Sequence, residues 1–154
     1  MNIAPEKSYA FEFLDRNASQ VALLNDNIFY FGELGMQEYE TAGLMTELLE
    51  RAGFQVERGI AGFPTGFCAT WGSGAPVVAI HTEYDANPDN SQQSGVAQSA
   101  AIVEGAPGHC EGHNSNGAVM VSAALAAKAA MEKFGLKGTL KVFGAPAEEQ
   151  LISR

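Results

Sequence analysis

The feature that most restricts the fold is a long apolar segment, residues 113–134, which lies between two shorter apolar runs. Its apolar side chains recur on nearly every side at helical spacing, which is typical of a helix buried between two layers. Residues 76–81 (PVVAIH) predict a strand buried on both faces, and residues 139–143 (TLKVF) predict another strand. Because a helix that crosses between two strands favours parallel pairing, the pattern predicts an α/β fold with a mixed, largely parallel sheet sandwiched by helices.

The first part of the chain predicts two further helices. Apolar positions at helical spacing indicate one long helix over residues 8–31, which Gly32 ends, and a second helix over residues 37–52. Glu38 is expected to point away from the apolar stripe of that second helix.

Two short segments and a long irregular one follow. Alternating or β-rich patterns predict strands at residues 54–57 and 66–71. Residues 86–106 show no steady period, and a loop of this length in a compact domain is often functional. The alternative is a disordered excursion from the surface.

Residue types that bind metals gather in three segments that the predicted fold brings to one edge. Residues 81–85 follow a strand, residues 108–114 precede the apolar helix, and Glu148 and Glu149 follow the last strand. Ligands of open α/β sheets bind beyond the carboxyl ends of the strands. The three segments therefore predict a shared site.

The chemistry of these segments suits a metal centre. Zinc accepts imidazole, thiolate and carboxylate ligands, and the surplus of candidates suggests two ions bridged by a carboxylate or water. A carboxylate outside the coordination sphere could act as a general base. Each segment also has a plain structural explanation: polar filling of a loop at 108–114, a solvated turn at Glu148, or the start of a turn at Asp85.

Composition limits the class of function. Asp and Glu number 18 against 9 Lys and Arg, and this net charge of −9 argues against binding to nucleic acid. Two cysteines are too few for a disulfide scaffold, and no apolar run is long enough to span a membrane. Residues 1–7 lack the apolar core of a signal peptide, so we expect a cytoplasmic protein that contacts no membrane.

Taken together, these segments resemble the zinc-dependent amidohydrolase and carboxypeptidase family that includes aminoacylase and aminobenzoyl-glutamate hydrolase. The resemblance is strongest to the branch of aminobenzoyl-glutamate and indole-acetyl-amino-acid hydrolases. Residues 83–88 (EYDANP) are similar to its Asp-x-Asp-Ala-Leu-Pro segment, and residues 108–114 (GHCEGHN) to its Gly-His-x-Cys-Gly-His-Asp/Asn loop. Residues 146–149 match its Pro-Ala-Glu-Glu, and residues 31–38 resemble the end of its first helix.

The resemblance implies roles for four residues. His113 and Glu149 would be metal ligands, Glu148 would be the general base that takes a proton from water, and Asp85 would orient a ligand. The cofactor would be a divalent metal, zinc or manganese, with up to two ions. The reaction would be hydrolysis of the amide bond in an N-acyl or aryl-acyl amino acid similar to aminobenzoyl-glutamate.

The sequence departs from the family pattern in two ways. Glu111 stands where this branch carries its cysteine ligand, and Cys110 lies one place earlier. A carboxylate is a harder ligand that makes manganese more plausible, so we expect Glu111 to bind metal and Cys110 to pack behind the loop. Family members also continue beyond the paired glutamates with a dimerisation domain and two further histidine ligands, whereas this sequence ends at Arg154.

We therefore expect residues 1–154 to be the N-terminal part of a metallo-amidohydrolase catalytic domain. The lid or dimerisation domain and the C-terminal part would be absent, which leaves hydrolysis incomplete in this chain alone. The substrate would be a small N-acyl amino acid or dipeptide-like molecule. The alternative is an inactive or partner-completed metal-binding subunit, either in a homo-oligomer or with a completing partner chain. In a third hypothesis the His and Glu residues are only polar surface.

Overall fold

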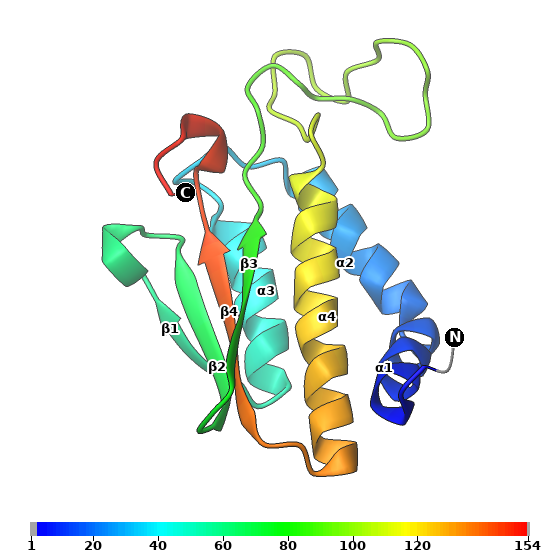
Figure 1. The fold of residues 1–154 in the computed structure, drawn as a ribbon. Coiled ribbons are helices and arrows are strands. Elements are labelled where there is room, and N and C mark those ends of the chain that lie inside the picture. Colours follow the sequence, from blue (N-terminus) through cyan, green and yellow to red (C-terminus); the bar gives the residue numbers. More distant parts are fainter. Residues whose placement is uncertain (1–2, 154) are drawn as a thin grey trace.

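The computed structural model describes residues 3–153, which form a four-stranded sheet with helices packed against it (Figure 1). The strands are β1 (Gln55–Arg58), β2 (Phe67–Ser73), β3 (Val77–Glu83) and β4 (Gly138–Ala145), in the order β1-β2-β4-β3. The helices are α1 (Pro5–Arg16), α2 (Ala18–Phe31), α3 (Tyr39–Arg51) and α4 (His113–Phe134), with short 3-10 turns η1 (Ile60–Gly62) and η2 (Glu148–Gln150).

The strand directions correct one prediction. The α/β class and the mixed sheet are confirmed, but β1 pairs with β2 and β2 with β4 in antiparallel fashion, and only β3 and β4 run parallel. The prediction of a largely parallel sheet is therefore wrong. Its physical reason is that α4 is the only helical crossover between neighbouring strands of the described residues, while β1 and β2 are joined by a short connection that reverses direction.

The helices lie on one face of the sheet in the part of the chain that the structure describes (Figure 1), so the predicted sandwich is also wrong there. Helices α3 and α4 contact the strands, and α1 and α2 pack on α4. The core between them is made of apolar side chains from both layers, which include Ile28, Met45, Leu49, Phe67, Ala69, Val121, Ala124 and Val142. In this single-sided arrangement α4 lies alongside β3 and β4, and its first residue, His113, contacts Asp85 just after β3.

The predicted first helix is two helices. Helix α1 ends at Arg16 and α2 begins at Ala18, with Asn17 between them at φ −108° and ψ 14°. The Asn17 amide donates to the carbonyl of Phe13 at 2.7 Å, so its side chain occupies a carbonyl at the end of α1. The continuous apolar spacing concealed this break, whereas Gly32 ends α2 in a left-handed conformation, as predicted.

Strand β3 is an edge strand and is not buried on both faces. Val77 is 60% exposed and Val78 is 50% exposed, which contradicts the prediction for residues 76–81. A short apolar run predicts a strand, but it cannot distinguish a central strand from an edge strand, because it does not show how many neighbouring strands will pair with it. The carboxyl end of β3 is different, because Thr82 is buried.

Helix α4 has the predicted bounds, 113–134, and Gly135 ends it in a left-handed conformation. Its close approach to α2 and α3 requires a small residue at Gly117. A Cβ atom there would lie 2.9 Å from Ile28 Cδ1 and 3.2 Å from Met45 Sδ. The described helices include none with the length and apolarity that a membrane crossing needs.

Candidate metal centre

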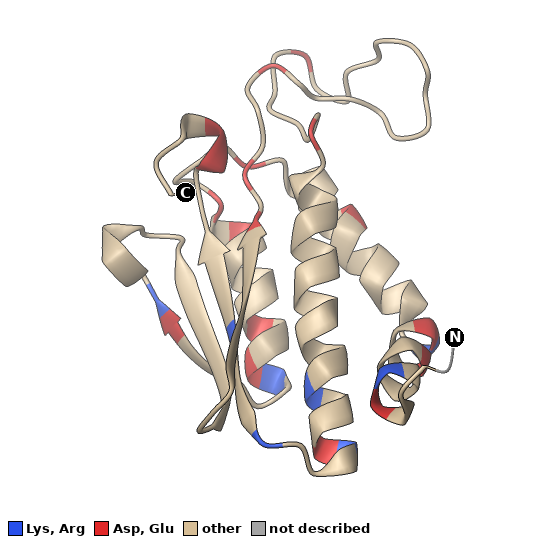
Figure 2. Cartoon of the chain, viewed as in Figure 1, with Lys and Arg blue, Asp and Glu red and all other residues tan. Residues whose placement is uncertain are grey.

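Three segments meet above the carboxyl ends of β3 and β4. They are the residues that follow β3, the loop that enters α4, and the η2 turn that follows β4 (Figure 1). Figure 2 shows acidic segments at this edge, with no basic segment beside them in the described part of the chain. The predicted convergence of the segments around 81–85, 108–114 and 148–149 is therefore what the fold produces.

His113 is the central side chain of this edge. It is the first residue of α4 and is buried, and its Nδ1 lies 3.0 Å from Asp85 Oδ1 and 3.1 Å from the Asp85 carbonyl oxygen. Because both oxygens accept, Nδ1 carries the proton and Nε2 keeps its lone pair in the neutral ring. The hydrogen bond from the ring to the Asp85 carboxylate raises the pKa of His113 to about 9.

The free edge of the His113 ring faces carboxylates. Nε2 lies 3.4 Å from Glu83 Oε2 and 3.7 Å from Glu148 Oε2. Glu111, His113, Glu148 and Glu149 each offer one ligand atom, and these four atoms lie within 4.8 Å of one another. All four were candidate site residues from the sequence, and the structure brings them together.

Asp85 holds two of these residues at once. Its Oδ1 accepts from His113 Nδ1, and its Oδ2 accepts from the backbone N–H of Glu149 at 3.0 Å. Asp85 is 1% exposed, and these hydrogen bonds offset its burial so that its pKa lies below the ordinary value. Asp85 therefore supports the cluster through these two hydrogen bonds and is not one of its four members.

Glu148 and Glu149 sit on a turn that a second buried carboxylate fixes. Ala147, which precedes them, has φ 57°, and its N–H donates to Glu38 Oε1 at 2.8 Å. The hydroxyl of Thr65 donates to the other oxygen of Glu38 at 2.7 Å. Glu38 is 0% exposed, which contradicts its predicted place on the polar face of α3, and burial raises its pKa.

The carboxyl groups of Glu111 and Glu149 lie close together in the cluster. Burial, and then a hydrogen bond with the carboxyl group of Glu111, raise the pKa of Glu149. Asn87 contributes the opposing interaction, because its Nδ2 donates to Glu149 Oε1 at 2.6 Å. A cation would relieve the crowding of Glu111 and Glu149 more fully than a shared proton does.

The remaining side chains of the loop face elsewhere. His109 Nε2 donates to the carbonyl of Ile28 at 3.1 Å, and its ring stacks on Phe29, so His109 ties the loop to the end of α2. Burial lowers the pKa of His109. Cys110 is exposed, with Sγ 3.3 Å from Asn87 Nδ2, so the prediction that it packs behind the loop is wrong.

Sequence reasoning missed two supporting residues, Glu38 and Asn87. Asn87 precedes a proline and looked like part of a turn, and Glu38 looked like a surface residue of a helix. Neither local pattern contains a signal for partners 62 and 109 residues away. Glu83 was one of several candidates on β3, and it lies at the cluster.

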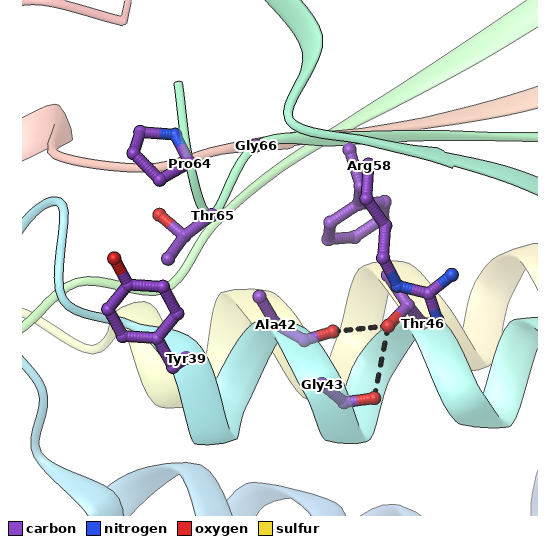
Figure 3. A pocket seen from close by; sticks show the side chains of 9 residues that line it. Tyr39, Ala42, Gly43, Thr46, Arg58, Pro64, Thr65 and Gly66 are labelled. Carbon is purple, nitrogen blue, oxygen red and sulfur yellow. Dashed lines mark hydrogen bonds between the residues drawn. The ribbon is translucent and has the colours of Figure 1, made fainter. Parts of the chain in front are cut away.

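A separate pocket of about 250 Å³ lies between α3 and the strand pair β1–β2 (Figure 3). Arg58 at its wall is paired with Glu50 at 2.6 Å, and Thr46 donates within its own helix. The lining includes Thr65, the donor to Glu38, but no member of the acidic cluster. The candidate metal ligands therefore lie outside this pocket, at the edge above β3 and β4.

Comparison with known proteins finds a hydrolase subunit and a dipeptidase that are similar to most of this chain. The chain is 40% identical over 124 residues to one subunit of the p-aminobenzoyl-glutamate hydrolase of Escherichia coli, a match that covers 80% of this chain and 26% of that protein. It is 33% identical over 156 residues to the Xaa-Arg dipeptidase of Mus musculus, covering 93% of this chain and 32% of that protein. No family model matches.

A solved structure agrees with both relatives. The chain superposes on a dinuclear metal-binding peptidase of the M20 family from Bacillus subtilis with a TM-score of 0.68 and 27% identity. The match covers 85% of this chain and 35% of that one. This chain belongs to the M20 peptidase and aminobenzoyl-glutamate hydrolase family. It spans about a quarter to a third of the length of the curated relatives that it matches.

The acidic cluster fits the divalent metal that the M20 family implies. One imidazole, from which a bound metal would displace a proton, and three carboxylates offer ligand atoms within 4.8 Å of one another, a donor set suited to zinc or manganese. The ring is oriented through Nδ1 by Asp85, as ligating histidines usually are by a carboxylate or carbonyl group. Exposed acidic groups alone would not carry this assignment, but His113 and Glu148 are buried.

Proposed function

We propose that this chain contributes the N-terminal part of the catalytic domain of a metal-dependent amidohydrolase. The substrate would be an N-acyl or aryl-acyl amino acid, in the class of aminobenzoyl-glutamate, or a dipeptide-like molecule. The observation that carries the proposal is the orientation of His113, whose Nδ1 is bound by Asp85 while Nε2 faces Glu83 and Glu148. The names of the hydrolase and dipeptidase relatives support the reaction class.

Glu111, His113 and Glu149 would hold the metal. We propose zinc, with manganese as the alternative that the carboxylates of Glu111 and Glu149 would also suit, and up to two ions, as in the dinuclear relative. A bound divalent ion would supply Lewis-acid polarisation of the amide carbonyl and would lower the pKa of water. Asp85 would keep His113 and the Glu149 backbone in place.

Glu148 would act as the general base that takes a proton from the attacking water and returns it to the leaving amine. Its carboxylate is buried, and Oε2 lies 3.7 Å from His113 Nε2, which puts it beside the candidate ligands. The Glu38 carboxylate would support this role indirectly, because it anchors the backbone of Ala147, the residue before Glu148.

A second proposal is that the chain is a metal-binding subunit completed by a partner chain. The Escherichia coli relative supports it, because its name describes one subunit of a hydrolase and so implies an assembly of different chains. A second copy of the same chain is the other form of this proposal. The chain alone would then bind metal without turnover, and hydrolysis would appear only with the completing chain.

Metal titration of the full 154-residue chain tests whether the proposed ligands bind a metal. We expect Zn²⁺ or Mn²⁺ to remain bound after dialysis to the wild type and to be lost from His113→Ala and Glu149→Ala, because both remove proposed ligands. Glu148→Gln should retain metal. Equal metal content in the wild type and in His113→Ala would overturn the proposed site.

Assays with aminobenzoyl-glutamate and N-acyl amino acids then separate the two functions. Turnover by the chain alone that a chelator removes and that Glu148→Gln abolishes would support the amidohydrolase reaction and contradict the expectation that hydrolysis is incomplete in this chain. Turnover only after addition of another chain would support the partner-completed subunit. Metal binding that never accompanies turnover under either condition would contradict the amidohydrolase assignment.

A further inference from the structure

We propose that Asn87 is a positioning residue of the candidate metal centre, which holds the Glu149 carboxylate beside His113 and Glu111. This inference rests on the proposed function. It concerns a residue that lies outside the predicted set of metal ligands.

The contact between Asn87 and Glu149 has a defined direction. Asn87 Nδ2 lies 2.6 Å from Glu149 Oε1. An ionised carboxylate can only accept hydrogen bonds, so the amide nitrogen must face Glu149 and the amide oxygen must face away. A hydrogen bond to a charged acceptor is stronger than one between neutral groups. Asn87 therefore restrains one oxygen of Glu149 and stabilises its ionised form.

The backbone of Asn87 is also fixed. Its N–H donates to the carbonyl of Gly108 at 3.1 Å, and the N–H of Gly108 donates back to the Asn87 carbonyl at 3.0 Å. At Gly108 the two segments approach so closely that a Cβ would lie 2.1 Å from the Asn90 carbonyl oxygen. The backbone of Asn87 thus joins the segment after β3 to the loop that carries Glu111 and His113. Its side chain connects both of them to the η2 turn through Glu149.

The need for this donor follows from the charges around Glu149. Glu111 and Glu149 both contribute ligand atoms to the cluster of 4.8 Å, so their negative charges repel each other without a metal. The hydrogen bond from the Glu149 backbone N–H to Asp85 fixes the main chain and does not restrain the carboxylate. Asn87 is the side-chain amide that donates to Glu149 among the described residues.

Titration of the full chain with Co²⁺, followed by its d–d absorption, tests the inference without any substrate. Asn87→Ala is expected to raise the Kd for Co²⁺ by about 10- to 100-fold, the usual effect of removing a partner of a metal ligand. Asn90→Ala is the matched control, because the Asn90 amide donates only to the exposed Pro88 carbonyl, and it should bind Co²⁺ like the wild type.

A double-mutant cycle distinguishes positioning of Glu149 from a general structural role. In the Glu149→Ala background, titrated to Co²⁺ concentrations high enough to fill the weakened site, Asn87→Ala should cause no further loss of Co²⁺ affinity, because its partner is gone. The thermal midpoint of the metal-free chain should differ little between the wild type and Asn87→Ala. Should Asn87→Ala fail to fold, Asn87→Leu decides, since it keeps a similar size, lacks the donor, adds no charge and is expected to weaken Co²⁺ binding.

The outcomes separate this inference from the proposed function. A wild-type chain that binds Co²⁺, with Asn87→Ala and Asn87→Leu equally tight, overturns the role of Asn87 and leaves the metal site standing. Equal losses from Asn87→Ala with and without Glu149 also overturn it. A wild-type chain that binds no Co²⁺ overturns both, because no metal ligand then exists for Asn87 to position.

Discussion

The two oxygens of the Asp85 carboxylate hold different parts of the candidate metal centre. Oδ1 accepts from the His113 ring, and Oδ2 accepts from the backbone of Glu149. Both groups are donors, so the site needs a side chain at this position that can only accept. The charge matters as well as the shape, because it sets the protonation of His113.

Asp85→Asn should therefore weaken metal binding although it preserves shape. The amide nitrogen of Asn would face either the Glu149 N–H, donor against donor, or His113 Nδ1, which would move the ring proton to Nε2 and block the ligand atom. We expect a loss of about 10- to 100-fold in metal affinity. In the metal-free chain the pKa of His113, followed by NMR, should fall from about 9 toward the ordinary 6.5. Asp15→Asn, on α1, is the control, and an unchanged His113 pKa in Asp85→Asn would contradict the prediction.

Glu38 allows a prediction of stability. Burial raises its pKa in the folded chain, so the folded state holds this proton more tightly than the unfolded state, and ionisation of Glu38 opposes folding as the pH rises. Glu38→Gln removes this pH dependence. Relative to the wild type, its free energy of unfolding should increase as the pH rises above the ordinary pKa of 4.5. Urea unfolding at several pH values measures the difference, and a constant difference would contradict the prediction.

Glu38→Ala is the contrasting variant at the same position. It leaves the N–H of Ala147 and the hydroxyl of Thr65 without their acceptor and opens a cavity. A cost of about 2–4 kcal/mol is expected at neutral pH. If Ala and Gln were equally stable there, the two hydrogen bonds would contribute nothing measurable.

The residues of the site differ in how far sequence could predict them. His113, Glu111 and Glu148 were candidates from the sequence because side chains that can bind metal or act as a base stand out in short segments, and the structure brings them together. Glu38 and Asn87 were missed because their importance comes from hydrogen bonds to the η2 turn, which is distant in sequence. A supporting residue has no distinctive local pattern, since any donor or acceptor that reaches the ligand can serve.

At the scale of elements, α2 anchors the start of α4. Asn25 Oδ1 accepts from Asn114 Nδ2 at 2.9 Å and from Ser115 Oγ at 3.0 Å, and His109 binds the Ile28 carbonyl one turn later. These contacts fix the helix end that carries His113. Helix α4 itself was predictable because its apolar pattern stops at Gly135. The antiparallel course of β2 was not, because strand direction depends on partners far along the chain.

Gly117 tests the packing that holds these elements together. Gly117→Val should cost about 1–3 kcal/mol, because its branches would overlap Ile28 and Met45 in a filled core. Gly117→Ala gains about 1 kcal/mol of helix propensity that offsets a tight contact with flexible side-chain ends, so its net change should be small. Gly43→Val is the control, since nothing lies within 4 Å of a Cβ there. Equal costs at Gly117 and Gly43, measured by chemical unfolding, would argue against close packing.

At the scale of the whole molecule, the candidate metal centre links segments that are far apart in the sequence. The loop before α4 and the turn after β4 supply the cluster, and Asp85 after β3 supports it, so metal binding requires the sheet and α4 to be assembled. A ligand that binds only the folded state stabilises the whole domain by mass action. The net charge of −9 adds a general effect, because any cation weakens the repulsion among acidic groups.

Thermal unfolding separates the specific effect from the general one. At a free metal concentration about 100 times Kd, Zn²⁺ or Mn²⁺ should add about 2.7 kcal/mol of stability, which corresponds to roughly 5–10 °C in the midpoint for a chain of this length. Chelator should reverse the shift. Sodium chloride at matched ionic strength should produce little of it, and His113→Ala should lose it while Glu47→Gln, an exposed substitution on α3 away from the cluster, keeps it. If His113→Ala were stabilised as much as the wild type, the metal would act through overall charge, and the cluster around His113 would not be its site.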